Sequence, residues 1–193
     1  MIQLNNQKLV SASKAMLLIF RILLVILILM AIIPWVAPTS ELGKFLLSLQ
    51  GFPAIMNANH KDIDSFMLTL TPLSRLFGFI GSVITLLPLL LGTVIMLKLS
   101  KNYINGNIFS LDNAKSYSQL GIIYFVSALL LQPIYQMFFY LCATINNPAG
   151  QRIIAFSIGI DSLTAIFFAI ILIVIGHVMK LGQKISEDQE LTI

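Results

Sequence analysis

The chain has 193 residues, of which 58% are hydrophobic and only 10% are charged. Soluble domains carry about 25% charged residues, so this composition excludes an ordinary soluble protein and indicates a chain that buries its apolar surface in lipid. The formal net charge is +4, but the basic residues lie beside apolar runs and form no single patch, which argues against direct nucleic-acid binding. The lone Cys142 excludes an intramolecular disulfide, and the sequence has no paired Cys/His spacing for a metal site.

The first apolar run extends over residues 16–37 and carries Arg21 as its one charge. A cleaved signal peptide is the alternative, but its apolar region is about 7 to 15 residues long and ends at a small-residue cleavage site. This run is longer and meets Pro38 at its end, so we predict a retained transmembrane helix. Arg21 lies about one turn inside, where its long side chain can extend back to the basic interface.

The longest segment between apolar runs covers residues 39–75. In its second half apolar residues recur at helical spacing: Ile63, Phe66, Met67, Leu70 and Leu73. This stripe predicts a helix at the membrane interface that caps the transmembrane helices, and such a stripe is more often packing than a ligand site. A strand hairpin around Gln50 and Gly51 is the alternative for the first half.

The second span is predicted over residues 76–97, where Pro88 removes a backbone donor at mid-helix and is expected to kink it. Small residues gather on one face of this span: Gly78, Gly81, Ser82 and Thr85. Small residues at three- and four-residue spacing allow close helix approach in lipid, so this face is a packing signal.

The connection 98–119 is polar and leads into a third span predicted over residues 120–143. The pair Asn105 and Gly106 predicts a tight turn. Ser110 stands three residues before Asn113, which predicts the N-cap of the helix that enters the third span.

The fourth span is predicted over residues 155–179, after a turn at 144–152, and carries Asp161 near its upstream end. An ionisable group inside a span needs a partner. Because the third and fourth spans run in opposite directions from their turn, Gln136 lies at a similar depth, and Gln132 lies one turn deeper. Two interpretations stay open, a polar clasp that fixes the registry of the two helices and the proton or cation relay of a transporter.

Four spans place both termini on one side of the membrane, and the basic residues decide which side. Eight basic residues fall on the side of the termini and four on the other. The positive-inside rule therefore places both termini, the loop 98–119 and the tail 180–193 in the cytoplasm, and the loop 39–75 outside. We predict an all-α polytopic membrane protein, with residues 1–193 forming one integral domain as an antiparallel four-helix transmembrane bundle.

The fourth helix is expected to continue beyond the membrane for about two turns, because Gly182 weakens the helical pattern by only about 1 kcal/mol. Leu181 and Ile185 then lie on one face. Phe109 emerges on the same side, and an exposed phenylalanine beside two exposed aliphatic residues is a poor surface unless they meet one another or a partner. We therefore expect Phe109 near the tail helix.

Two predicted cytoplasmic stretches, residues 106–114 (GNIFSLDNA) and residues 187–193 (EDQELTI), resemble a bacterial family of small four-span membrane proteins. This is the domain-of-unknown-function family 2975, and the resemblance covers nearly the whole chain in layout. Members are often encoded beside a small helix-turn-helix regulator, so the resemblance implies a cytosolic regulatory partner and supplies no catalytic residues. The candidate docking residues are Phe109, Ser110, Asn113, Glu190, Leu191, Thr192 and Ile193.

The sequence contains no nucleophile and base pair, no glycine-rich phosphate loop and no HExxH-type helix, so neither an enzyme nor a cofactor is expected. Our leading hypothesis is a non-enzymatic bacterial inner-membrane protein that senses membrane state or an external signal. Its acidic tail and capped loop would engage a basic cytosolic regulator, unless both are simply solvated ends. The alternative function is a small transporter or immunity-type protein that uses Asp161.

Overall fold

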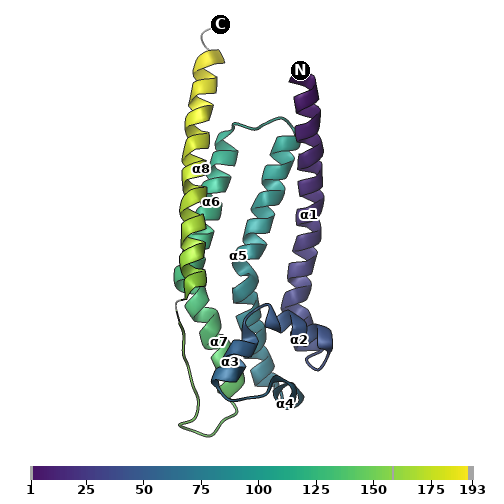
Figure 1. Ribbon diagram of the computed structural model, residues 1–193, viewed down its shortest axis with the longest axis vertical. Coiled ribbons are helices and arrows are strands. Elements are labelled where there is room, and N and C mark those ends of the chain that lie inside the picture. Colours follow the sequence, from purple (N-terminus) through teal and green to yellow (C-terminus); the bar gives the residue numbers. More distant parts are fainter. Residues whose placement is uncertain (1, 158, 191–193) are drawn as a thin grey trace. The chain divides into compact units, whose positions relative to one another are not determined.

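The computed structural model describes residues 2–157 and 159–190, and it describes no side chain for residues 2–7, 161 and 186–190. The described residues form the helices α1 (Ile2–Val36), α2 (Glu41–Ser48), α3 (Phe52–Ala58), α4 (Ile63–Leu68), α5 (Pro72–Ile104), α6 (Leu111–Val126), the π-helical turn η1 (Ser127–Leu131), α7 (Gln132–Thr144) and α8 (Ile160–Glu190) (Figure 1). No strand occurs among them, so the hairpin alternative is wrong. A turn at Gly51, with a φ of 77°, joins α2 to α3 instead.

Four helical segments in the described part of the chain are long and apolar enough to span a membrane: Lys8–Val36, Pro72–Ile104, Leu111–Thr144 and Ser162–Ile185. The all-α, polytopic membrane class predicted from the sequence is therefore confirmed. The third of these segments is continuous through η1. A π-helical turn inserts one residue into the helical repeat and is often found at functional sites.

The chain divides into two compact units. The first contains Met1–Val25, Leu89–Ala128 and Ile160–Ile193, and the second contains Ile26–Pro88 and Leu129–Gly159. Each unit is described by itself below.

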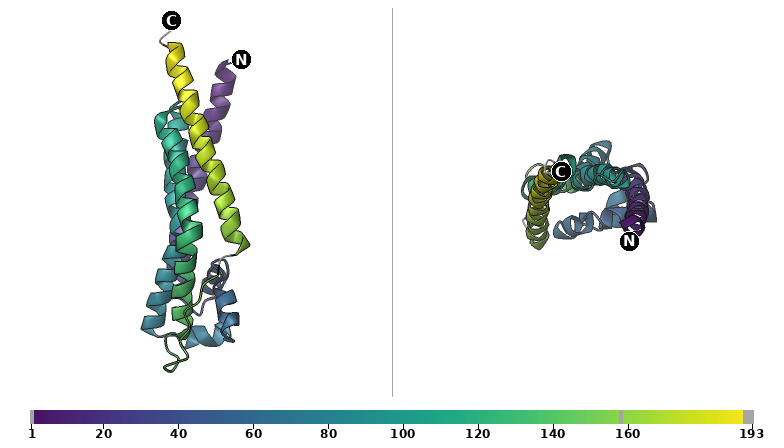
Figure 2. Two further views of the ribbon diagram at one scale, coloured as in Figure 1. Left: turned by 90° about the vertical axis from the view of Figure 1, so that its left-hand side faces the viewer. Right: turned by 90° about the horizontal axis from the view of Figure 1, so that it is seen from above.

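In the first unit, α6 and α8 pack against each other, and the left view of Figure 2 shows α8 lying obliquely across α6. Their backbones approach closely at two glycines. A Cβ on Gly121 would lie 2.7 Å from the carbonyl oxygen of Ala169, and a Cβ on Gly176 would lie 2.9 Å from that of Ala114. Residue numbers rise along α6 as they fall along α8, so the two helices are antiparallel. Small residues at such crossings are typical of helices that associate in lipid.

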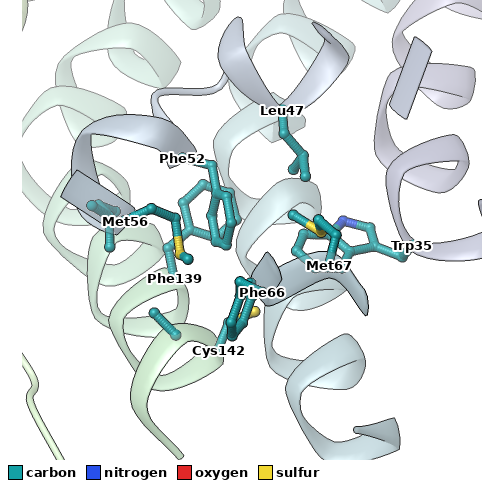
Figure 3. Packing of buried hydrophobic residues seen from close by; sticks show 10 residues of the cluster. Trp35, Leu47, Phe52, Met56, Phe66, Met67, Phe139 and Cys142 are labelled. Carbon is teal, nitrogen blue, oxygen red and sulfur yellow. The ribbon is translucent and has the colours of Figure 1, made fainter. Parts of the chain in front are cut away.

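In the second unit, the core consists of the buried residues Trp35, Leu47, Phe52, Ile55, Met56, Phe66, Met67, Phe139, Cys142 and Ala143 (Figure 3). The ring of Phe52 lies at its centre, with its centroid 5.9 Å from that of Trp35 and 5.1 Å from that of Phe139. The predicted apolar stripe thus contributes to this core, because Phe66 and Met67 of α4 are both buried in it.

The small face predicted on the second span is confirmed as a packing face, and its neighbours are aromatic rings. A Cβ on Gly78 would lie 2.0 Å from the Trp35 ring, and a Cβ on Gly81 would lie 2.5 Å from the Phe139 ring. The Trp35 Nε1 donates to Ser82 Oγ at 2.8 Å. The small residues of α5 therefore make room for the rings of Trp35 and Phe139.

Polar contacts fasten the short helices of the second unit. Ser40 caps α2 and Asp62 caps α4, each through its side chain to a backbone N–H three residues on. Lys44 of α2 forms ion pairs with Glu41 at 3.0 Å and with Asp64 at 2.6 Å. The Lys61 ammonium donates to the carbonyl oxygen of Ala143 at the end of α7, where a cation also complements the helix dipole.

The fourth span differs from the sequence prediction at its start. Helix α8 begins at Ile160, whereas we expected helix from about residue 155. Residues 151–157 and 159 have no helical structure. The physical reason is that side chains of α7 pair with the backbone of this segment, as described next.

Candidate functional site

Of the polar residues predicted to cluster inside the membrane, Gln136 pairs through its side-chain amide with the backbone of Ser157. Its Oε1 accepts from the Ser157 N–H at 2.7 Å, and its Nε2 donates to the Ser157 carbonyl at 3.1 Å. Gln132 lies at the first position of α7, directly after η1. Asp161 is the second residue of α8, but its side chain lies outside the described part of the chain. The pairing of Asp161 with Gln136 or Gln132 therefore stays a prediction.

A second pair of the same kind joins α7 to this segment. Thr144 Oγ1 accepts from the Ile153 N–H at 3.1 Å and lies 3.2 Å from the Ile153 carbonyl oxygen. Backbone N–H and C=O groups outside a helix need other hydrogen-bond partners, and these two side chains supply partners that a helix would otherwise provide. We call the pairs Gln136–Ser157 and Thr144–Ile153 the backbone clamp.

The spacing of the backbone clamp explains why both pairs form together. From residue 136 to 144, eight helical residues rise about 12 Å at 1.5 Å each. From residue 153 to 157, four extended residues cover about 13 Å at 3.3 Å each. The extended segment can therefore run beside α7 in the opposite direction with both ends in register. The sequence signal for half of this device was Gln136, which we assigned to the Asp161 cluster, whereas Thr144 was predicted only as the start of the turn.

On the loop between α5 and α6, the predicted N-cap is confirmed. The Ser110 side chain accepts from the Asn113 N–H at 3.2 Å, and Gly106, with a φ of 81°, forms the expected turn. The buried side chain of Asn113 accepts from Asn102 Nδ2 at 2.7 Å and donates to the carbonyl oxygen of Asn107 at 2.6 Å. Ser110 and Asn113, predicted as docking residues, thus hold the loop in shape.

Phe109 lies between these anchors and contacts the tail helix. A Cβ on Gly182 would lie 3.4 Å from Phe109 Cδ1, so the ring packs on the glycine, and α8 continues to Glu190. Both predictions, the helical tail and its contact with Phe109, are confirmed. Phe109, Leu181 and Ile185 are 60%, 57% and 60% exposed, and we call these three residues the apolar tail surface. At 3.6 residues per turn, Leu181 and Ile185 lie on one side of α8, next to Gly182.

The remaining docking candidates carry no structural description. The side chain of Glu190 and the whole of residues 191–193 lie outside the described residues. Within the described residues, no group of three His, Cys, Asp or Glu side chains could hold a metal ion. The described residues offer surfaces for association.

Comparison with known proteins places the chain in a family. A family model described as a protein of unknown function, DUF2975, matches residues 53–193. A search of curated proteins and a search of solved structures each returned no match. The matched part begins at the second residue of α3, after α1 and α2, and extends through α8, so it includes the backbone clamp, the capped loop and the tail helix. Because the family model matches well over half of the chain, the chain belongs to the DUF2975 family.

Proposed function

We propose that this protein is a non-enzymatic protein of the bacterial inner membrane that senses membrane state or an external signal and engages a cytosolic helix-turn-helix regulator. The observation that carries the proposal is the apolar tail surface. Phe109, Leu181 and Ile185 are each more than half exposed, and the two on α8 lie at the end of its apolar segment, after the basic residue Lys180. Exposed apolar patches outside the hydrocarbon region mark interaction sites.

The loop that presents Phe109 supports docking because it is held rigid. The cap at Ser110, the hydrogen bonds of the buried Asn113 and the turn at Gly106 fix the backbone on both sides of the phenylalanine. A rigid aromatic side chain loses little conformational entropy on binding, and such residues dominate interface energetics.

The chemistry of the partner follows from the charge next to the surface. Beyond Ile185, the tail carries Glu187, Asp188 and Glu190 within four residues. DNA-binding regulators carry basic surfaces, so an acidic segment beside apolar anchors complements them in charge. This orientation requires the termini to lie in the cytoplasm, as the distribution of basic residues predicts.

Helix α8 also offers a route for the signal. It runs without interruption from Ile160 to Glu190, so it joins the segment held by the backbone clamp covalently to the apolar tail surface. A signal that releases the clamp would change the helical start of α8. We propose that the regulator, bound at the other end of the same helix, recognises this change.

The test is site-specific photocrosslinking in the intact membrane. A photoreactive amino acid replaces Ile185 in the full-length protein, which is co-expressed with the helix-turn-helix protein encoded beside its gene. Replacement of Ile170, which is 52% exposed at mid-span, is the matched control. We expect a crosslink from position 185 and none from position 170, with the former abolished by Phe109→Ala.

Two results would contradict the proposal. One is a crosslink of equal yield from both positions, and the other is no crosslink at all while the variant inserts normally. A genome that carries no such regulator gene beside this one would remove the proposed partner.

A further inference from the structure

A cavity of about 300 Å³ lies between α6 and α8, away from the backbone clamp. Its polar lining comes from Lys115, Ser118, Gln119, His177 and Lys180. Gly176 also lines it, and the missing side chain opens the space, because a Cβ there would lie 2.3 Å from Ser118 Oγ. Small-molecule sites occupy about 300 to 1,000 Å³, so the cavity has room for a polar group of modest size.

The ionisable residues in the described lining of this cavity are all basic. Two lysines and a histidine line it, and no carboxylate is found among its described lining residues. The ion pairs found in the described part of the chain involve Lys44, in the other unit. The cavity therefore presents ammonium, hydroxyl and amide donors to an anion, without a carboxylate to compete for them.

The position of the cavity along the helices decides what kind of anion can occupy it. The apolar run of α8 ends at Ile175, directly before Gly176 and His177, and that of α6 begins at Leu120, directly after Gln119. Such a change from apolar to basic and polar sequence is expected where the hydrocarbon region meets the headgroups. On its membrane side the lining continues with Ile122, which is 55% exposed.

We propose that this cavity binds the phosphate headgroup of an anionic phospholipid, with an acyl chain of that lipid lying over Ile122. Basic pockets between transmembrane helices at this depth suit lipid phosphates, and each lysine near the membrane surface strengthens the attraction. The exposed side chain of Ile122 favours a lipid, because a free phosphate ion has no acyl chain and could contact only the polar lining residues. This inference goes beyond the proposed docking of a regulator and does not depend on it.

The experiment is a lipid titration of the full-length protein in detergent, followed by native mass spectrometry. Phosphatidylglycerol is compared with phosphatidylcholine and with inorganic phosphate. The variant Lys115→Gln/Lys180→Gln removes two charges from the cavity. The matched control, Lys98→Gln/Lys101→Gln, removes two exposed charges from α5 outside the cavity lining. Circular dichroism shows that each variant keeps its helical structure.

We expect phosphatidylglycerol to bind the wild type more tightly than phosphatidylcholine does. Its affinity should fall about fivefold for each cavity lysine removed, and by less than about twofold in the control. Lys115→Arg/Lys180→Arg should retain binding. Equal losses in both lysine pairs would overturn the proposal, as would equal binding of the two lipids. Binding of inorganic phosphate with the same affinity as the lipid would show a free-anion site and would overturn it as well.

Discussion

In the first unit, α6 and α8 meet where side chains are absent, at Gly121 and Gly176, whereas in the second unit the helices meet around the rings of Trp35, Phe52 and Phe139. The first arrangement is stabilised by close packing of the two backbones. In lipid, which is itself apolar, such packing drives helix association. The second resembles the core of a soluble protein.

The difference follows from what surrounds each contact. Helices α2, α3 and α4 fall outside the four apolar segments that can span a membrane, so their apolar side chains gain from burial against one another. Phe52 is the first residue of α3, and its ring is fully buried at the centre of that core. One chain thus uses two packing strategies, and single substitutions should separate them.

The largest effect is expected from Phe52→Ala in the aromatic core. A buried phenylalanine replaced by alanine costs about 3 to 5 kcal/mol, through lost burial and the cavity left behind. Trp35 is the sole tryptophan of the sequence and packs edge-on against Phe52, so its fluorescence reports on this unit. Unfolding should be followed by this fluorescence in detergent. The control Phe45→Ala, at a residue 58% exposed, should stay within about 0.5 kcal/mol of wild type.

The next effect should come from Gly121→Ala, which tests the glycine contact. The added Cβ would lie 2.6 Å from Ile173 Cγ1 and 2.7 Å from the Ala169 carbonyl oxygen, so α6 and α8 must move apart. Overpacking of this kind costs about 1 to 3 kcal/mol. Thermal unfolding by circular dichroism measures it. The matched control is Gly159→Ala, because nothing lies within 4 Å of a Cβ at that position. Gly121→Ala should leave the Trp35 fluorescence of the folded protein unchanged. A change in this fluorescence would show that the glycine contact and the aromatic core are not independent.

A smaller, local effect is expected from Gln136→Leu/Thr144→Val, which removes both halves of the backbone clamp. The N–H groups of Ile153 and Ser157 lose their side-chain partners, and because neither residue is buried, the loss costs less than an unpaired group in a packed core. Amide hydrogen exchange should accelerate at these positions by about tenfold or more, while exchange within α6 is unchanged. Thr164→Val, which loses only a bond to the carbonyl oxygen of Ile160, should leave both rates alone.

The smallest effect should follow Lys44→Met, which removes the ion pair to Glu41 within α2 and the ion pair to Asp64 of α4. The hydrogen bond to Asp64, and then that to Glu41, raises the pKa of Lys44 above its ordinary value of 10.5. The stabilisation is therefore fully present below pH 10.5 and is lost as the pH rises through the raised pKa. The melting temperature of Lys44→Met should fall slightly below that of wild type at pH 8, and the difference should disappear in strong alkali. A difference that grows in alkali would show that another interaction is involved.

Local signals made part of this architecture predictable. The length of the apolar runs predicts four spans, and a serine three residues before Asn113 predicts a cap, because both features depend on neighbours in the sequence. The contact of Phe109 with the tail helix was predictable as well. It follows from connectivity together with the unfavourable exposure of three large apolar side chains on one side of the membrane.

Contacts distant in sequence were not predictable in the same way. Ile153, Ile154 and Phe156 suit a helix and an extended chain equally, and the outcome depends on Gln136 and Thr144 of another helix. Likewise, Gly121 and Gly176 look like isolated helical glycines until the register of α6 against α8 brings each to a backbone oxygen. The resemblance in layout also extended further toward the N-terminus than the family match, which begins at residue 53.

The backbone clamp has an evolutionary consequence. Gln136 pairs with the main-chain N–H and carbonyl groups of Ser157 in addition to its hydroxyl, and Thr144 binds the main-chain N–H of Ile153, so most of this pairing does not require a particular side chain at those positions. Homologues should therefore tolerate almost any residue from 153 to 157, apart from a proline at either paired position, which lacks the N–H group. Insertions and deletions between the two pairs should be rare, since a single added residue would lengthen the extended path by about 3.3 Å and break its match to α7.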